Sequence, residues 1–131
     1  MAELIGGWKL VESEGFDDYM KEVGVSLITR KAAITLKPNV TISRDGDVWC
    51  IKTESTFKNT DLKFELNKLF KETTADGREC ETIITLEDGK LIQNQKWDGK
   101  ESTITREVKD GKMITICVFD KVECRRVYEK K

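Results

Sequence analysis

The sequence predicts an all-β fold, a ten-stranded antiparallel up-and-down barrel, and three observations support this prediction. Turn signals recur along the chain, the segments between them are short and alternating, and Pro38 is the only proline. Asp-Gly is the clearest turn signal, because glycine adopts the positive φ of a primed turn and aspartate bonds to the backbone that follows. Five such pairs occur: Asp45-Gly46, Asp76-Gly77, Asp88-Gly89, Asp98-Gly99 and Asp110-Gly111.

The part of the chain before Pro38 contains one strand and two short helices. The strand begins near Trp8 and ends at Gly15. Apolar residues then recur at helical spacing as far as Gly24, which ends a first helix, and Ser26 can cap a second. The buried side of the first helix carries Tyr19, Met20 and Val23. These helices, over about residues 16–36, form a helix-turn-helix between the first and second strands.

The number of strands follows from the number of turns after Pro38. Weaker turn signals stand at Asn59-Thr60, Asn67-Lys68 and Asp120-Lys121. With the five Asp-Gly pairs they make eight turns and nine strands, or ten strands with the first. Such a meander hides its edges by curling into a closed or nearly closed barrel, a β-clam, and the helices would cover one mouth as a lid. We expect one domain over residues 1–131.

The turn at Asp120-Lys121 allows a check of register. If these two residues form the turn, Cys117 lies opposite Cys124 and Thr115 lies opposite Arg126. Directly opposed Cβ atoms are about 4.5 to 5.5 Å apart, which is slightly wide for a disulfide. The register therefore favours a free inward-facing pair of thiols over a redox-sensitive bridge.

Composition excludes several classes of function. The net charge of −1 offers no basic field for nucleic acid. Neither a signal peptide nor an apolar run of about 20 residues is present, so we expect a cytosolic protein, and a monomer. The chain has no histidine and no paired cysteine spacing, which argues against a metal site and against Ser-His or Cys-His catalysis. We expect no cofactor and no enzymatic activity.

Two arginines and a tyrosine lie on faces that are otherwise directed inward. On a strand only one parity is buried, and this parity places Arg106 beside Ile104, and Arg126 and Tyr128 beside Cys124. Burying two guanidinium groups is costly unless an anion accompanies them. A carboxylate accepts a bidentate pair of hydrogen bonds from arginine, and the tyrosine hydroxyl adds a neutral donor. The interior is therefore suited to a long-chain monocarboxylate.

Distinctive short motifs occur along nearly the whole chain: Gly7-Trp8-Lys9, Phe16-Asp17-Asp18-Tyr19-Met20-Lys21, Lys37-Pro38, Glu54-Ser55-Thr56-Phe57-Lys58, Thr73-Thr74-Ala75-Asp76, Trp97-Asp98-Gly99-Lys100-Glu101 and Arg126-Val127-Tyr128-Glu129-Lys130. These motifs resemble those of the intracellular fatty acid-binding protein family, a calycin family of lipid-transport proteins, with the epidermal, heart, adipocyte and myelin P2 types closest. The resemblance implies a ten-stranded barrel that carries long-chain fatty acids without catalysis. It implies that Arg106, Arg126 and Tyr128 hold the carboxylate.

The resemblance also implies roles for further residues. The acyl-chain and portal positions are Phe16, Tyr19, Met20, Pro38, Thr53, Phe57, Lys58, Ala75 and Asp76, and the inward-facing Ile104, Thr115 and Cys117 join them. Lys21, Arg30 and Lys31 match a basic nuclear-import patch of some members, which would add a nuclear location and contact with nuclear receptors. The same basic side chains suit transient contact with anionic membranes. The cysteine pair is similar to one in epidermal-type members, which keeps a regulated disulfide between Cys117 and Cys124 open as the alternative to free thiols.

Two alternatives to a fatty acid carrier stay open at this point. A retinoic acid carrier would use the same arginine-arginine-tyrosine trio. A membrane-associated structural role, as in myelin P2, would need two opposed basic faces, and the near-neutral net charge argues against it.

Overall fold

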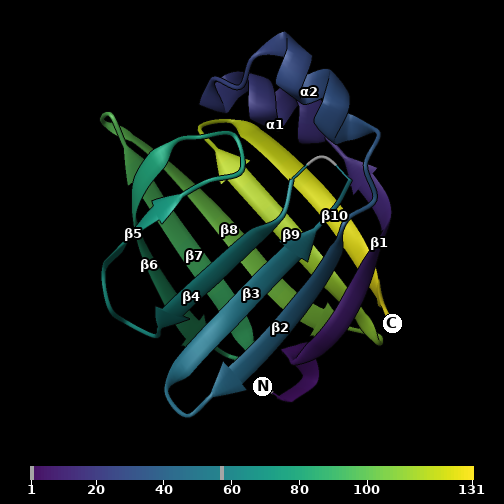
Figure 1. Ribbon diagram of the computed structural model, residues 1–131, viewed down its shortest axis with the longest axis vertical. Helices are drawn as coiled ribbons and strands as arrows, with labels where there is room; N and C mark the ends of the chain where they lie inside the picture. Colours follow the sequence, from purple (N-terminus) through teal and green to yellow (C-terminus); the bar gives the residue numbers. More distant parts are fainter. Residues whose placement is uncertain (1, 57) are drawn as a thin grey trace.

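A computed structural model, which describes residues 2–56 and 58–131, confirms the predicted ten-stranded antiparallel barrel with two helices between the first and second strands (Figure 1). The helices are α1 (Phe16–Val23) and α2 (Leu27–Ile34), and a 3-10 helix, η1 (Ala2–Leu4), precedes the first strand. The strands are β1 (Gly6–Glu14), β2 (Asn39–Asp45), β3 (Val48–Glu54), β4 (Thr60–Glu65), β5 (Phe70–Thr73), β6 (Glu79–Glu87), β7 (Lys90–Trp97), β8 (Lys100–Lys109), β9 (Lys112–Phe119) and β10 (Val122–Lys130).

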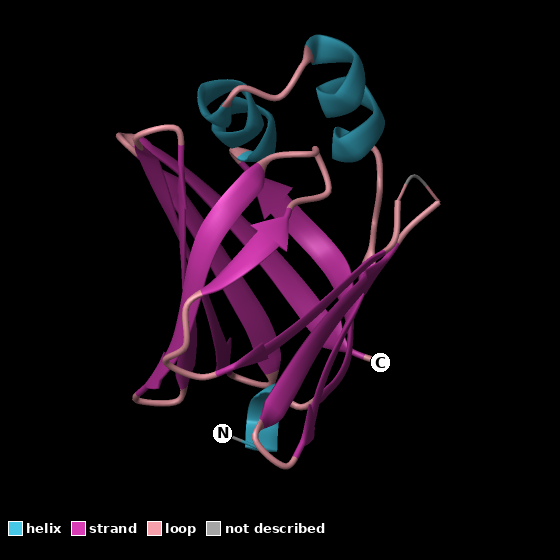
Figure 2. Ribbon diagram, turned by 60° about the vertical axis from the view of Figure 1, so that its left-hand side comes forward, coloured by secondary structure: helices cyan, strands magenta, loops and turns pink. Residues whose placement is uncertain are grey.

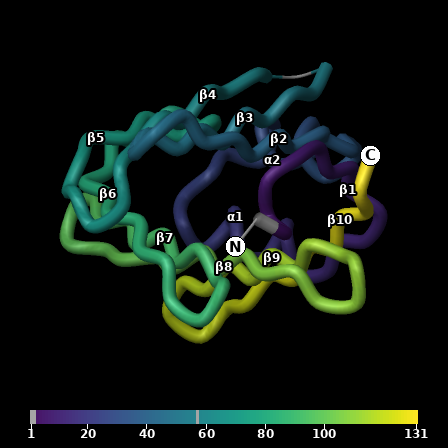
Figure 3. Tube along the Cα trace, turned by 90° about the horizontal axis from the view of Figure 1, so that it is seen from below, coloured from purple at the N-terminus to yellow at the C-terminus, as the bar shows by residue number. Residues whose placement is uncertain are grey.

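The barrel is open along one seam. Strands that follow each other in the chain pair with each other, with the exception of β4 and β5, and β1 also pairs with β10. Within the described residues, β4 and β5 are therefore the two ends of the sheet. Viewed along the barrel, the strands form a ring (Figure 3). A single backbone bond from the β4–β5 loop, from Asn67 N–H to the carbonyl of Ile84 on β6 (2.9 Å), ties this loop to the sheet.

Three of the Asp-Gly pairs form the expected two-residue turns. At Asp88-Gly89, Asp98-Gly99 and Asp110-Gly111 both residues have positive φ, and the residues on either side pair directly. Asp120 also has positive φ (54°), and its turn gives the predicted register, with Cys117 opposite Cys124 and Thr115 opposite Arg126.

Three other predicted turns are displaced. Asp45 pairs with Val48, so the turn consists of Gly46-Asp47, and Gly46 takes the positive φ of 61° because it has no Cβ. Asp76-Gly77 lies within a longer loop over residues 74–78, in which the Thr74 side chain bonds to Asp76. Thr60 is already in β4, where it pairs with Thr53, so it belongs to the strand and not to the turn.

The helices form where the local signals place them. Gly24 ends α1 in a left-handed conformation (φ 102°), and its N–H bonds to the carbonyl of Lys21. The Ser26 hydroxyl caps α2 by accepting a hydrogen bond from the N–H of Thr29 (3.4 Å). Tyr19, Met20 and Val23 are buried as predicted, whereas α2, all of which is described, buries none of its residues. The lid therefore has one anchored helix and one that lies largely on the surface.

Figure 2 shows η1 and the two lid helices at opposite ends of the barrel, and the core has two parts. One surrounds η1, where Trp8 Nε1 donates to the carbonyl of Leu4 (2.9 Å), and it includes Trp49, Phe64 and Met113. The other lies under the lid and joins the buried side of α1 to the sheet. The end near η1 is thus filled by large side chains, and the lid end contains the hollows described below.

Candidate functional site

The register of β8, β9 and β10 brings the two predicted arginines together. Thr115 on β9 pairs with Arg106 on β8 and with Arg126 on β10, so the three residues form one row across the sheet. Tyr128 lies two residues beyond Arg126 on the same strand and is also buried. The trio predicted from strand parity therefore comes from two strands, β8 and β10, which lie on either side of β9.

Arg126 is 7% exposed and is held by an aromatic ring. Its guanidinium carbon lies 3.8 Å from the centre of the Phe16 ring, which comes from the first turn of α1. Arg126 Nε and Thr115 Oγ1 are both buried, and neither has a hydrogen-bond partner in the described part of the chain. Buried polar atoms normally have partners, so these two atoms are available for hydrogen bonds with a ligand.

Arg106 differs because the protein already supplies it with a partner. Its Nη1 donates to Gln93 Oε1 (2.8 Å), and Gln93 Nε2 donates to a carboxylate oxygen of Glu72 (2.9 Å). The same Glu72 oxygen accepts hydrogen bonds from Thr82 Oγ1 (2.9 Å) and Gln95 Nε2 (3.1 Å). Glu72 is thus an internal carboxylate that partly balances the charge of Arg106.

Sequence analysis missed this network although strand parity could have revealed it. Gln93 and Gln95 share the buried parity of β7 with Leu91 and Trp97, and Thr82 shares that of β6 with Ile84. An amide at a buried strand position requires a hydrogen-bond partner. The buried parity of Gln93 and Gln95 was therefore a signal that the interior contains another polar group.

Both tyrosines of the site stay neutral at ordinary pH. Burial raises the pKa of Tyr128, although the charges of Arg126 and Arg106 act in the opposite direction. Burial and the nearby Cys117 raise the pKa of Tyr19 to about 12. The Tyr19 hydroxyl forms a short hydrogen bond with Ser102 Oγ, which attaches α1 to β8. A neutral Tyr128 keeps a proton with which it can donate to an anion.

Two adjoining hollows lie under the lid, of about 210 and about 190 Å³. Phe16, Tyr19, Thr53, Ala75 and Asp76, all predicted for the acyl chain or the portal, line both. The hollow nearer α2 is also lined by Met20, Pro38, Lys58 and Arg126, and the deeper one by Ile104, Arg106 and Cys117. Each is smaller than the ~300 to 1,000 Å³ of typical ligand sites, whereas the two together fall in that range.

Two predicted residues line neither hollow. Thr115 and Tyr128 are buried beside the arginines instead. Phe57 lies outside the described residues.

The wall that the two hollows share contains an ion pair, Asp76 and Arg78, that sequence analysis did not predict. Arg78 binds Asp76 through Nε (2.6 Å) and Nη2 (3.1 Å), and its guanidinium carbon lies 4.5 Å from the centre of the Trp97 ring. Burial acts to raise the pKa of Asp76, but the hydrogen bonds and charge of Arg78, with the Thr74 hydroxyl, outweigh it and lower this pKa. Arg78 has the buried parity of Cys80 and Thr82, so its inward position could also have been read from the sequence.

The three basic lid residues have different surroundings. Lys21 and Lys31 are exposed. Arg30 is largely buried and joins the two helices, because its Nε binds Asp17 (3.0 Å) and its Nη1 donates to the carbonyl of Val25 (2.9 Å). Part of the charge predicted for an import patch is thus paired within the lid.

Cys117 and Cys124 are neighbours across the β9–β10 hairpin, and all four cysteines, which lie in the described part of the chain, are free. The Cys124 thiol donates a hydrogen bond toward Cys117 and so lowers the pKa of Cys117, to which the charges of Arg106 and Arg126 also contribute. Cys124, as the donor, has a raised pKa. Cys117 is therefore the more acidic thiol of the pair.

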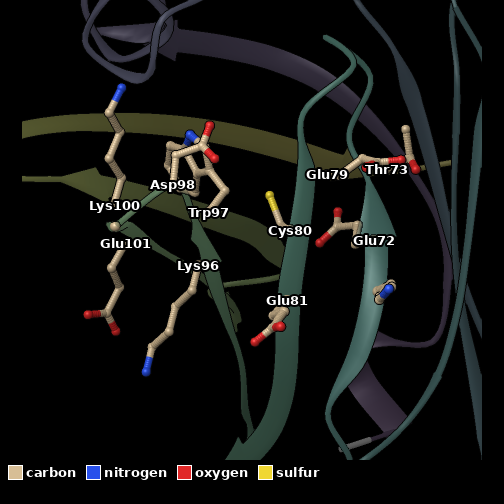
Figure 4. A pocket seen from close by; sticks show the side chains of 12 residues that line it. Glu72, Thr73, Glu79, Cys80, Glu81, Lys96, Trp97, Asp98, Lys100 and Glu101 are labelled. Carbon is tan, nitrogen blue, oxygen red and sulfur yellow. The ribbon is translucent and has the colours of Figure 1, made fainter.

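A wider hollow, of about 600 Å³, lies on the side of the barrel between β5 and β8, away from the arginine row. Its lining is mostly charged, and in Figure 4 Lys100 points to one side of the hollow while Lys96 and Glu101 point to the other. Because these side chains diverge, they do not form a coordinated set, and the smaller hollows under the lid are the better candidate for a site. The described residues contain no group of three or more potential metal ligands, and no helix among them is long and apolar enough to cross a membrane.

Comparison with known proteins identifies the family. The profile of the lipocalin / cytosolic fatty-acid binding protein family matches residues 5–131. The adipocyte fatty acid-binding protein of Pygoscelis papua is 55% identical over 128 residues, which are 98% of this chain and 97% of the relative. Fatty acid-binding protein 5 of Mus musculus is 55% identical over 130 residues, 99% and 96% of the two chains.

Solved structures agree over the whole barrel. The REP1-NXSQ fatty acid transporter superimposes with a TM-score of 0.96 at 46% identity and covers 100% of this chain and 98% of its own. A Schistosoma mansoni fatty acid binding protein in complex with arachidonic acid gives a TM-score of 0.96 at 37% identity, covering 100% and 98%. With its lidded ten-stranded barrel and these full-length matches, the chain belongs to the lipocalin / cytosolic fatty-acid binding protein family.

Proposed function

We propose that this protein is a non-catalytic intracellular carrier of long-chain fatty acids, and that Arg126 is the principal group that binds the carboxylate. The observation that carries the proposal concerns Nε of Arg126, on a guanidinium that is 7% exposed, and the hydroxyl of Thr115, the cross-strand partner of Arg126: neither atom has a hydrogen-bond partner among the described residues. A buried cation with a free N–H donor binds a carboxylate far more tightly than it binds a neutral headgroup. The relatives are named as fatty acid-binding or transport proteins, which supports the same ligand class.

The surroundings of Arg126 suit an amphipathic ligand. The hollow that Arg126 lines has an apolar side formed by the lid, with Met20, Val23 and Ala33, and a polar side that includes Lys58, Asp76 and Arg78. Burial of an acyl chain there contributes about 25 cal/mol per Å² of apolar area, and the arginine fixes the orientation of the chain. Arg106 and the neutral Tyr128 act as secondary partners, because the charge of Arg106 is already shared with Glu72 through Gln93.

The test compares oleate with oleyl alcohol in delipidated protein, by displacement of a fluorescent fatty acid. Arg126→Ala should weaken oleate by roughly tenfold to a hundredfold, as expected for a charge-assisted hydrogen bond, and should leave the alcohol nearly unchanged. Arg125→Ala is the matched control, because Arg125 is the adjacent residue but is exposed on the other face of β10. Equal losses for acid and alcohol would refute the role of Arg126.

The same titration with retinoic acid ranks the second carrier function. Tighter binding of retinoic acid than of oleate would replace the fatty acid by a retinoid as the ligand. An absence of saturable displacement by any of the three would direct attention to a structural role at membranes.

A further inference from the structure

Two nitrogens of the Arg78 guanidinium bind a protein carboxylate, and the third has no partner among the described residues. Nε and Nη2 bind the two carboxylate oxygens of Asp76, and the Trp97 ring lies against the plane. Nη1 is buried, and no acceptor for it exists among the described residues. Because Asp76 and Trp97 fix the group from two sides, Nη1 is a donor in a defined position and not the tip of a mobile side chain.

Arg78 is also placed where a bound chain must pass. It is the one arginine of the described residues that lines both hollows under the lid, since Arg126 lines only the hollow near α2 and Arg106 only the deeper one. Its donor is therefore separate from the arginine row on β8 to β10. A ligand whose carboxylate binds Arg126 and whose chain occupies the hollows passes along the wall that contains Arg78.

We propose that Arg78 is a second polar anchor, which selects fatty acids that carry a neutral oxygen, a hydroxyl or keto group, along the chain. This proposal rests on the proposed carrier function. The chemistry of the anchor specifies a neutral oxygen, because Asp76 already balances the positive charge and would repel a second carboxylate. A hydroxyl elsewhere in the hollow would lose its hydrogen bonds to water without compensation.

The experiment uses delipidated wild-type protein and measures the affinities of stearate, a series of hydroxystearates with the hydroxyl at successive positions, and octadecanedioate. We expect most hydroxystearates to bind more weakly than stearate, and those with the hydroxyl opposite Arg78 to bind at least as tightly. In Arg78→Met these favoured acids should lose about tenfold in affinity relative to stearate. Octadecanedioate should show no dependence on Arg78.

Arg44→Met is the matched control. Arg44 also lies over a tryptophan, Trp49, at 5.5 Å, but it is exposed and lines neither hollow. The Arg44→Met variant should therefore bind stearate, the hydroxystearates and octadecanedioate as tightly as wild-type protein does. A flat hydroxystearate series, equal losses for stearate and hydroxystearates in Arg78→Met, or dependence of the diacid alone on Arg78 would each overturn the proposal. Failure of wild-type protein to bind stearate would instead refute the carrier function.

A second measurement does not depend on the variant folding. In wild-type protein labelled with ¹⁵N-arginine, the guanidinium resonance of Arg78 should shift when the favoured hydroxystearate replaces stearate. The resonance of Arg126 should stay where stearate places it, because the carboxylate is common to both ligands. A shift at Arg126 without one at Arg78 would contradict the assignment of the second anchor.

Discussion

At the scale of single residues, the two central arginines share a row but have different partners. Arg106 donates to Gln93, which leads to the Glu72 carboxylate, whereas Arg126 packs on Phe16 and keeps an unpaired Nε. An internal carboxylate lowers the cost of burying one guanidinium when no ligand is bound. Within the described residues, the protein thus supplies a polar partner to Arg106 but none to Nε of Arg126.

Glu72→Gln tests this division. The amide keeps the shape of the carboxylate but turns three charge-assisted hydrogen bonds into neutral ones, so we expect the free energy of unfolding of delipidated protein to fall by about 1 to 3 kcal/mol in urea titrations. Saturating oleate should restore part of the loss, because its charge replaces that of Glu72. The exposed Glu79→Gln should change stability by less than about 0.5 kcal/mol. Unchanged stability of Glu72→Gln would exclude Glu72 as an internal counter-ion.

Tyr19 and Tyr128 are the only tyrosines, so their ionisation can be followed directly. Burial raises the pKa of both, for Tyr19 to about 12, whereas unfolded tyrosine ionises near pH 10. Because the folded pKa is the higher one, this stabilisation is complete below about pH 10 and is lost as pH rises toward 12. For Tyr19 alone the loss amounts to about 2 to 3 kcal/mol.

Ultraviolet absorbance of phenolate against pH provides the measurement. Folded protein should show almost no phenolate at pH 10, and the signal should appear together with unfolding at higher pH. Tyr19→Phe should make stability between pH 10 and 12 less dependent on pH. Two tyrosines that titrate near pH 10 in folded protein would be inconsistent with the burial of these hydroxyls.

At the scale of elements, the lid is asymmetric. α1 buries Tyr19, Met20 and Val23 against the sheet, and its Tyr19 binds Ser102 on β8, whereas α2 buries no residue of its own. Arg30 is a polar link between them, through Asp17 on α1 and the Val25 carbonyl. We therefore expect α2 to move more readily than α1 when a ligand enters or leaves.

Arg30→Met should speed the release of bound fatty acid. Loss of an ion pair that is partly exposed removes about 0.2 to 1 kcal/mol, which corresponds to a release rate up to about fivefold faster. Stopped-flow transfer of a fluorescent fatty acid to vesicles measures this rate. Lys31→Met, an exposed change on the same helix, is the control and also removes one charge. Equal rates for the two variants would mean that Arg30 acts only through its charge and does not hold the lid.

At the scale of the whole molecule, strand number, hairpin register and the inward arginines could be predicted, because turn residues and the two-residue period are local properties of the chain. The position of the open seam could not. A signal at Asn67 predicts that the chain reverses, but it does not determine whether the strands on either side pair, and β4 and β5 diverge. The polar network around Glu72 is only half predictable, because parity directs Thr82, Gln93 and Gln95 inward but does not identify the group that they bind.

This seam should be the weakest part of the barrel. β4 and β5 each pair on one side only, and β5 has just four residues, whereas β9 pairs along its full length with β8 and β10. Opening that breaks few hydrogen bonds and exposes little apolar area costs the least free energy.

Hydrogen exchange should therefore be fastest in β4 and β5 and slowest in β9, near the limit set by global unfolding. Oleate should slow exchange in β4 and β5 more than in β9, since Thr60 and Asp61 of β4 and Glu72 of β5 line the deeper hollow. Protection in β4 and β5 equal to that in β9 would show that the gap in pairing does not weaken the barrel.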